Sequence, residues 1–400
     1  QLNVDLNRYN LNRDQSLYLK IGANSPNDQN VSMNVRVYDE MIFETEVKIR
    51  EGLNRRDFPL DISKYGPGDH EITVTLDEGK KSSEFVFSIT RYDLEEINRF
   101  EKEIGDIQTL DDKKIQESIS SIEYKLEDIY ESVDEIKAYE DFHPISKKIE
   151  NLKSDIETVR QGKDLFIKGE AKRLAFRSDI DCSLQPYSIF IPENVSRSPP
   201  MIVFLHGSGT DDRSIFKNEY NTKLAKNSSS ILLAPFARGT SHAYSPEYSL
   251  GDVEEIVKKM IEIWDVGRDN IYLAGFSMGG YGVLRNYDHD PEVYSGLIII
   301  SGIYSFDKEA DYLKGKFGDI AIPNYSEDDK ITRFSSMPMI LFHGKEDKNC
   351  SYNDMKRFID SLREINENVE AYYKENRGHS GLKDDWYRKL GRWLNKQIDH

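Results

Sequence analysis

Residues 1–91 carry short runs in which hydrophobic and polar residues alternate, as they do in half-buried β-strands. The clearest runs cover residues 17–21, 31–37 and 71–76, and a Gly-Pro-Gly turn at 66–68 separates the last two. Short strands with glycine and proline in their turns predict an antiparallel β-sandwich of the immunoglobulin-like type. This segment contains no tryptophan, so we expect a structural or lid-supporting role and not an aromatic sugar-binding platform.

The hydrophobic spacing becomes helical over residues 92–165. Apolar residues recur there at alternating steps of three and four, which places them along one seam of each of two helices. The two helices are joined at His143-Pro144, which predicts an antiparallel helical hairpin, with a shorter third helix before it. Since a two-helix seam is a small core, we expect it to pack on the rest of the chain or on a second subunit. A homo-oligomer formed through the helical or the β region therefore stays open. The seam comprises Ile115, Ile119, Ile122, Leu126, Ile129, Val133 and Ile136, then Ile145, Ile149, Leu152, Ile156 and Val159.

Residues 166–400 alternate continuous apolar runs with amphipathic segments. The apolar runs suit strands that are buried on both faces, and the segments between them have helical periodicity. This alternation predicts an α/β fold on a mainly parallel sheet with helices on both faces, preceded by the small β-sandwich and the helical hairpin. The strand runs are 200–205, 270–274 and 337–342, and the helical segments are 252–264, 352–366 and 383–397.

The sequence Gly275-Phe276-Ser277-Met278-Gly279 lies between a predicted buried strand and a predicted helix. A Gly-x-Ser-x-Gly in that context predicts a nucleophile elbow, a turn so sharp that small residues must flank a strained serine. Such a turn exposes the serine hydroxyl above the sheet, where it can attack a substrate. Ser277 is therefore the candidate nucleophile.

A candidate acid and a candidate base follow Ser277, each just after a predicted strand. Asp347 comes after the run 337–342 and is expected to orient the base, with its neighbour Glu346 as the alternative. Of the eight histidines, His379 is the one that follows the last predicted strand after Asp347. Serine, acid and histidine in this order are typical of α/β-hydrolases.

A glycine-rich turn, His206-Gly207-Ser208-Gly209, follows the first apolar run. Small residues there let backbone N–H groups approach a negatively charged oxygen, together with the N–H of the residue after the nucleophile. We predict an oxyanion hole formed by Gly207, Ser208 and Met278. Acyl transfer by a serine, a histidine and an acid needs neither a metal nor a cofactor, so we expect none.

From about Lys168 onwards the chain resembles an α/β-hydrolase of the esterase kind. It is similar to the group that holds feruloyl and acetylxylan esterases, polyhydroxybutyrate depolymerase-like enzymes and prolyl-oligopeptidase-type catalytic domains. The resemblance implies a serine esterase with a Ser-His-Asp triad and an acyl-enzyme. Its substrates would be small-molecule or polysaccharide-linked esters, among them feruloyl or acetyl esters of plant polysaccharide. The matching motifs are the hairpin 185–192, the turn 205–209, the elbow region 269–280, and the segments around Asp347 and His379.

Two segments that follow predicted strands on the catalytic side are the candidate pocket walls, residues 239–246 and 304–326. We predict substrate contacts from His242, Tyr244 and Tyr304, although the tyrosines could equally be packed in the interior. A serine peptidase of the prolyl-oligopeptidase type is the alternative enzyme, but its propeller gate would need several hundred more residues than precede this region. A non-catalytic scaffold or adhesion protein is the alternative of another class.

Composition restricts the partners. The formal net charge of −17 argues against nucleic acid and anionic membranes as partners. No apolar run approaches the roughly 20 residues of a membrane span. Cys182 and Cys350 form neither a disulfide framework nor a zinc site, and we interpret both as free thiols. The chain opens with Gln1, so a removed signal peptide is one explanation, and it favours a secreted or cell-envelope location over a cytoplasmic one.

Overall fold

The computed structural model describes the whole chain apart from residues 1, 13–14, 80, 108–111, 135–144 and 399–400. By the distances between Cα atoms, the chain divides into two compact units. One comprises residues 1–110 and 122–163, and the other comprises residues 111–121 and 164–400. The helical segment contributes to both units, and the division into three domains stays a prediction.

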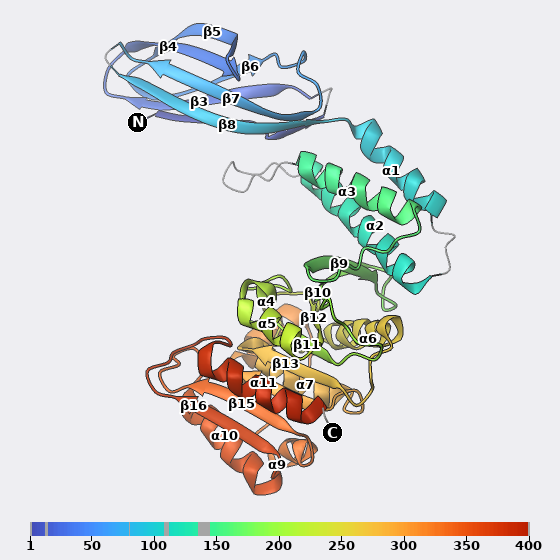
Figure 1. Ribbon diagram of the computed structural model, residues 1–400. Coiled ribbons are helices and arrows are strands. Elements are labelled where there is room, and N and C mark those ends of the chain that lie inside the picture. Colours follow the sequence, from blue (N-terminus) through green and yellow to red (C-terminus); the bar gives the residue numbers. More distant parts are fainter. Residues whose placement is uncertain (1, 13–14, 80, 108–111, 135–144, 399–400) are drawn as a thin grey trace. The chain divides into compact units, whose positions relative to one another are not determined.

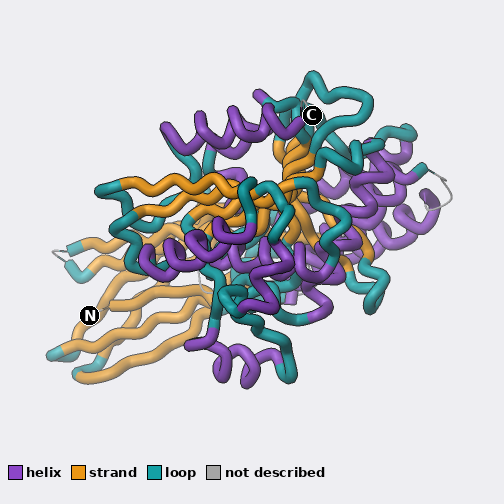
Figure 2. Tube along the Cα trace, turned by 90° about the horizontal axis from the view of Figure 1, so that it is seen from below, coloured by secondary structure: helices purple, strands orange, loops and turns teal. Residues whose placement is uncertain are grey.

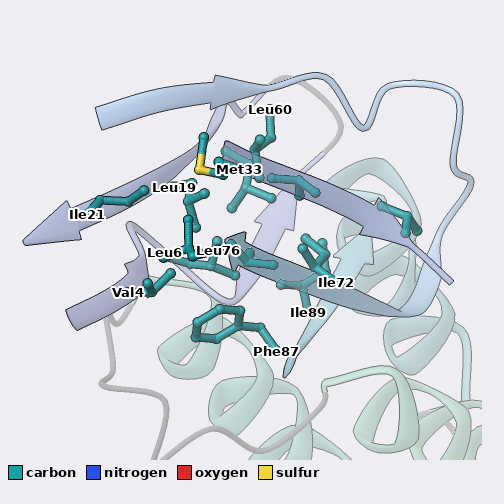
Figure 3. Close-up of a cluster of buried hydrophobic side chains, with 14 of the residues drawn as sticks. Val4, Leu6, Leu19, Ile21, Met33, Leu60, Ile72, Leu76, Phe87 and Ile89 are labelled. Atoms are coloured by element: carbon teal, nitrogen blue, oxygen red, sulfur yellow. The ribbon is translucent and has the colours of Figure 1, made fainter. Parts of the chain in front are cut away.

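The β region forms a two-sheet sandwich. One sheet has the strand order β1-β3-β6, and the other has the order β2-β8-β7-β4-β5. Alternate side chains of β3, such as Leu17 and Leu19, are buried, while Tyr18 between them is exposed. The buried sides of both sheets contribute to one apolar cluster (Figure 3). The sandwich is present as predicted, while its immunoglobulin-like class stays a prediction. The strands are β1 (Leu2–Leu6), β2 (Asn10–Asn12), β3 (Leu17–Ser25), β4 (Gln29–Val37), β5 (Glu40–Ile49), β6 (Gly52–Leu60), β7 (Gly68–Asp77) and β8 (Ser82–Tyr92).

Three helices follow the sandwich in the chain. The predicted seam of the second and third helices is buried wherever its residues are described, apart from a half-buried Val133. Ile136 and the break at His143-Pro144 lie outside the described residues. In the part of the chain that the structure describes, no helix is both long and apolar enough to cross a bilayer. The three helices are α1 (Leu94–Ile107), α2 (Lys113–Asp134) and α3 (Ile145–Arg160).

The second unit is built on an eight-stranded sheet (Figure 1). Its strand order is β16-β15-β14-β13-β11-β12-β10-β9, in which the strands from β16 to β12 are parallel. Strands β10 and β9 are antiparallel and form one edge. This is an α/β-hydrolase fold, and the predicted fold class is confirmed. The strands are β9 (Ala171–Arg177), β10 (Leu184–Phe190), β11 (Met201–Leu205), β12 (Ile231–Pro235), β13 (Ile271–Phe276), β14 (Gly296–Ile300), β15 (Met339–Gly344) and β16 (Val369–Lys374).

Helices cover the sheet on both faces, which explains why its central strands are continuously apolar (Figure 2). On one face, α5 and α11 bury Leu224, Trp386 and Trp393 in a cluster with alternate residues of the strands. Helix α7 packs against β13 and β14, and α6 packs against α7. The helices are α4 (Ser214–Lys217), α5 (Glu219–Asn227), α6 (Glu247–Trp264), α7 (Met278–His289), α8 (Ala310–Phe317), α9 (Asp328–Ile331), α10 (Tyr352–Ile365) and α11 (Asp384–Ile398), with short 3₁₀ helices at Asp307–Glu309 and Thr332–Phe334.

The start of α2 belongs to this second unit and carries a buried carboxyl group, Glu117. Its Oε1 lies 3.5 Å from the Lys259 ammonium of α6, and its Oε2 has no hydrogen-bond partner among the described residues. Burial raises the pKa of Glu117 from 4.5 to about 7, although the attraction of Lys259 opposes the shift. Folding therefore favours the protonated form of this side chain.

Stability should consequently fall as the pH rises, because between the two pKa values the folded chain keeps a proton that the unfolded chain has lost. Glu117→Gln cannot ionise, so it should not show this loss. From about pH 5 to pH 8, the free energy of unfolding of wild type should therefore fall by about 2–3 kcal/mol relative to that of the variant. Denaturant unfolding at both pH values measures this. Glu262→Gln, on the same helix as Lys259, is the control because Glu262 is exposed. Parallel pH dependence in Glu117→Gln and wild type would contradict the assignment.

Candidate active site

Ser277 lies at the turn between β13 and α7. Its backbone has φ 57° and ψ −119°, and a positive φ is uncommon for residues other than glycine. The Ser277 N–H donates to the Ile300 carbonyl at 3.0 Å, which ties the turn to the neighbouring strand. Gly279 lets α7 approach the sheet, since a Cβ there would lie 2.2 Å from the carbonyl oxygen of Leu205. The serine thus has the strained geometry expected of a nucleophile elbow.

An aspartate and a histidine meet beyond the ends of two neighbouring parallel strands. Asp347 follows β15 and His379 follows β16. The Nδ1–H of His379 donates to Asp347 Oδ2 at 2.8 Å. The loops that carry them approach closely because Gly344 has no side chain: a Cβ there would lie 2.2 Å from the carbonyl oxygen of Arg377. Close packing of two loops therefore sets this side-chain contact.

The second oxygen of Asp347 is held by the turn that follows it. Oδ1 accepts the N–H groups of Asn349 and Cys350, each at 2.9 Å. The Asp347 carboxylate is buried, whereas Glu346, the alternative acid, is exposed. The structure thus joins Asp347, and not Glu346, to His379. A carboxylate fixed by these hydrogen bonds can hold one imidazole tautomer and stabilise positive charge on the ring.

Ser277 and His379 line one cavity of about 520 Å³. The ring of His379 lies against that of Phe276, with 4.9 Å between the ring centres. Among the described residues that line this cavity, His379 is the one whose side chain can carry a charge. The other lining side chains are apolar or neutral, and they include Phe204, Thr210, Ser214, Ile215, Asn218 and Leu382.

The turn after β11 lies beside the nucleophile. A Cβ on Gly207 would lie 3.4 Å from the Cβ of Ser277, so the backbone of this turn is adjacent to the serine. Gly207 and Ser208 line the same cavity as Ser277, and Met278 is the first residue of α7. The structure brings these residues together around the serine, and their role as oxyanion donors stays a prediction.

Two residues predicted to contact substrate belong to the core instead. His242 is 1 % exposed: its Nε2–H donates to the Ala237 carbonyl at 2.6 Å, and its Nδ1 accepts the Tyr244 N–H at 2.9 Å. Burial lowers the pKa of His242 to about 4, so the ring is neutral. Tyr244 is fully buried, and its hydroxyl donates to the His206 carbonyl at 3.1 Å. The structure corrects the prediction: both rings are buried in the interior, where their polar atoms keep hydrogen-bond partners.

Tyr304, the third predicted contact residue, is half-buried and stacks on Phe358, with 5.2 Å between the ring centres. It lines a second cavity, of about 710 Å³, which Asp347 and Cys350 also line. Tyr304 does not line the cavity that contains Ser277. A substrate contact for Tyr304 therefore stays a prediction that concerns the second cavity.

Sequence reasoning missed Cys350. Its thiol is buried and lies beside the side chain of Ser277. Burial outweighs this contact and raises the pKa of Cys350 to about 12, so the group is a neutral thiol. Cys350 follows Asp347 by three residues, and this spacing within one tight turn is the signal that would have placed it beside the site.

Residues 242–400 match the Prolyl oligopeptidase family, a range that contains Ser277, Asp347 and His379 but less than half of the chain. This match supports a hydrolase in the second unit. A search of curated proteins found no match. Whether this hydrolase cleaves esters or peptides does not follow from the family match, because both reactions use the same groups.

Solved structures with a similar hydrolase region include enzymes of both kinds. A ferulic acid esterase is 16% identical, with a TM-score of 0.48, over 58% of this chain and 99% of its own. A putative dipeptidyl aminopeptidase IV from Bacteroides ovatus is 15% identical, with a TM-score of 0.47, over 57% of this chain and 36% of its own. An S-formylglutathione hydrolase from Agrobacterium tumefaciens is 14% identical, with a TM-score of 0.45, over 57% and 93%. These similarities select no substrate.

The contrast between Asp347 and Glu346 can be measured directly. Asp347→Asn should lower kcat by about 10³–10⁴-fold, because an amide no longer favours the tautomer in which Nδ1 of His379 carries the proton. Glu346→Gln, the matched control, should change kcat by less than about twofold, since its exposed side chain lies outside the pair. Steady-state kinetics on one ester would compare them. A larger loss in Glu346→Gln than in Asp347→Asn would reverse the assignment.

Proposed function

We propose that this chain is a serine carboxylic-ester hydrolase with Ser277 as nucleophile, His379 as general base and Asp347 as the residue that orients the base. The observation that carries the proposal is the buried hydrogen bond between Asp347 and His379, next to a serine in a strained turn. A free serine hydroxyl is a weak nucleophile and needs an adjacent base. The three side chains stand at the ends of parallel strands of one sheet, where open α/β sheets hold their sites.

In the proposed reaction, Ser277 Oγ attacks the ester carbonyl carbon while Nε2 of His379 takes the hydroxyl proton. The bond to the leaving alcohol then breaks, and His379 returns the proton to the alcohol oxygen. Water then attacks the acyl carbon while His379 takes its proton, the bond from that carbon to Ser277 Oγ breaks, the carboxylic acid leaves, and His379 returns the proton to Ser277. Asp347 keeps the other ring nitrogen protonated, so that Nε2 remains the acceptor.

The negative oxygen of the tetrahedral intermediate needs donors that are already in place. We propose the backbone N–H groups of Gly207, Ser208 and Met278 for this role. The closeness of the Gly207 backbone to Ser277 supports it, and a donor of this kind typically contributes about 10²–10³ in kcat.

The cavity beside Ser277 supports an ester with a neutral, partly apolar group. Its lining offers the rings of Phe204 and Phe276 and, apart from His379, no side chain that carries a charge among the described residues. A volume of about 520 Å³ is larger than an acetyl group needs and falls within the usual range of ligand pockets. We therefore propose aromatic acyl groups of the feruloyl kind as better substrates than acetyl groups.

A peptidase of the prolyl-oligopeptidase type is the second candidate, and the family match over residues 242–400 is the observation that favours it. The esterase proposal is supported against it by the cavity lining, which among the described residues has no charged side chain apart from His379 to pair with the charged terminus of a peptide. The described strands before residue 110 also form a sandwich and not the radial blades of a propeller.

For the β-sandwich we propose the immunoglobulin-like class. The chain passes from the five-stranded sheet at β5 to the three-stranded sheet at β6 and returns at β7, a connection between sheets that such sandwiches use. We also propose that the sandwich and the helices serve access of large substrates or assembly of a homo-oligomer, since small esters reach a serine without help from a lid.

The nucleophile is tested by Ser277→Ala. The small side chain still fits the turn, so the variant should fold while kcat falls by several orders of magnitude, to the residual rate that binding and the oxyanion hole still support. A labelled fluorophosphonate should mark wild type and not the variant. Ser208→Ala is the matched control, since Ser208 lines the same cavity and its backbone N–H is retained. Labelling that persists in Ser277→Ala and disappears in Ser208→Ala would show that Ser208, and not Ser277, is the nucleophile.

The substrate class is tested with three chromogenic compounds: p-nitrophenyl acetate, an aromatic acyl ester such as p-nitrophenyl ferulate, and a proline-containing peptide anilide. We expect both esters to be cleaved, with the higher kcat/KM for the aromatic ester, because the cavity can desolvate its ring. Efficient cleavage of the anilide together with weak cleavage of both esters would favour the peptidase.

A further inference from the structure

Three different kinds of metal ligand converge beside the serine. Asp347, Cys350 and His379 offer a carboxylate oxygen, a sulfur and an imidazole nitrogen that all lie within 4.8 Å of one another. Asp347 and Cys350 are buried, and His379 is half-buried. The proposed hydrolysis uses the carboxylate and the imidazole but gives the thiol no part. The cluster therefore contains a chemical group that the proposed mechanism leaves unexplained.

The backbone fixes this convergence. The Cys350 N–H donates to Asp347 Oδ1 at 2.9 Å, so the turn after β15 folds back and brings both side chains together. His379 reaches the same place from the next loop through its 2.8 Å hydrogen bond to Asp347 Oδ2. The Cys350 carbonyl is in turn bonded to His343 Nε2 at 3.0 Å, which anchors the turn to β15. The backbone thus holds the three ligand atoms within 4.8 Å of one another, and an ion would draw them together by about 1 Å, because ligands of tetrahedral Zn²⁺ lie about 3–4 Å apart.

The donor set selects the ion. Sulfur, nitrogen and one carboxylate oxygen suit Zn²⁺ and the more thiophilic Cd²⁺, which bind such mixed sets in four-coordinate sites. Mg²⁺ and Ca²⁺ prefer oxygen ligands alone. Two histidines lie near the buried carboxylate of Asp347, His343 at 3.7 Å and His379 at 2.8 Å, and each is charged only when protonated, so a divalent cation would add charge compensation.

The cluster is also accessible to an ion. Asp347 and Cys350 line the cavity of about 710 Å³, and His379 lines the cavity of about 520 Å³ that contains Ser277. Asn349 lines both cavities, so the three ligands stand at the wall between them. An ion could approach from either side without unfolding of the loops.

We propose that Asp347, Cys350 and His379 form a binding site for a thiophilic divalent cation of the Zn²⁺ class, and that the bound ion reversibly inhibits the hydrolase. When the ion binds, the Cys350 S–H bond breaks, its proton goes to solvent, and a metal–sulfur bond forms. The hydrogen bond between His379 and Asp347 breaks, the Nδ1 proton moves through solvent to Nε2, and Nδ1 and the carboxylate become ligands, with a water molecule completing the coordination. His379 can then no longer accept the Ser277 proton. The inhibition rests on the proposed function, whereas the metal binding does not.

Binding is measured without any substrate, by titration of the purified full chain with Cd²⁺ and detection of the ultraviolet absorption of the cadmium–thiolate bond. We expect one equivalent per chain, loss of the signal in Cys350→Ser, and an unchanged signal in Cys182→Ser. Cys182 is the matched control because it is the other free cysteine and is exposed. A signal that persists in Cys350→Ser, or none in wild type, would overturn the site.

A second variant keeps the test decisive if Cys350→Ser does not fold. His379→Gln retains both thiols and removes the imidazole, so its Cd²⁺ affinity should fall at least about tenfold. Equal affinity in His379→Gln and wild type would show a cysteine that binds the ion without the cluster, and would overturn the proposal.

Inhibition is measured with Zn²⁺ on ester hydrolysis and on fluorophosphonate labelling. Zn²⁺ should suppress both in wild type and in Cys182→Ser, EDTA should restore them, and Mg²⁺ should have no effect. In Cys350→Ser, compared with its own metal-free rate, the Zn²⁺ needed for half-inhibition should rise at least about tenfold. Cadmium binding without ester hydrolysis by the metal-free wild type would contradict the proposed function alone. Hydrolysis that Zn²⁺ leaves unchanged would contradict the inhibitory role.

Discussion

The buried hydrogen bond between Asp347 and His379 is the interaction on which the site depends. A carboxylate at that depth is costly unless its oxygens are paired, and two backbone N–H groups and one imidazole satisfy it here. The same bond fixes which ring nitrogen of His379 carries the proton. The proposed chemistry at Ser277 follows from that choice of tautomer, and so does the proposed competition by a metal ion.

Backbone packing makes this bond possible. Strands β15 and β16 are in parallel register, so their carboxyl ends deliver the two loops to the same edge of the sheet. Gly344 allows the two loops to touch, and Gly279 allows α7 to approach the end of β11. A side chain at either position would separate elements that hold the site together. The apolar strands below, buried on both faces, give these contacts a rigid base.

The sequence was sufficient for the sheet and the elbow because both rest on local patterns. Continuous apolar runs marked the parallel strands, and Gly-x-Ser-x-Gly marked the turn at Ser277. Such patterns could not predict whether the side chains of a loop point into a pocket or into the interior. His242 and Tyr244 lie in a polar loop, yet hydrogen bonds to backbone carbonyls, of Ala237 in the same loop and of the distant His206, make their burial favourable. Cys350 was missed because the number of cysteines in the sequence does not show that the turn after β15 places one thiol beside Ser277.

A crystal structure of the full chain after reaction with a fluorophosphonate would test the central claim most directly. The account predicts one covalent bond from Ser277 Oγ to phosphorus, with the phosphoryl oxygen within hydrogen-bonding distance of the N–H groups of the Gly207 turn and of Met278. His379 should keep its bond to Asp347 in that adduct. Phosphorus bound to a different side chain, or His379 separated from Asp347 in the adduct, would contradict the account.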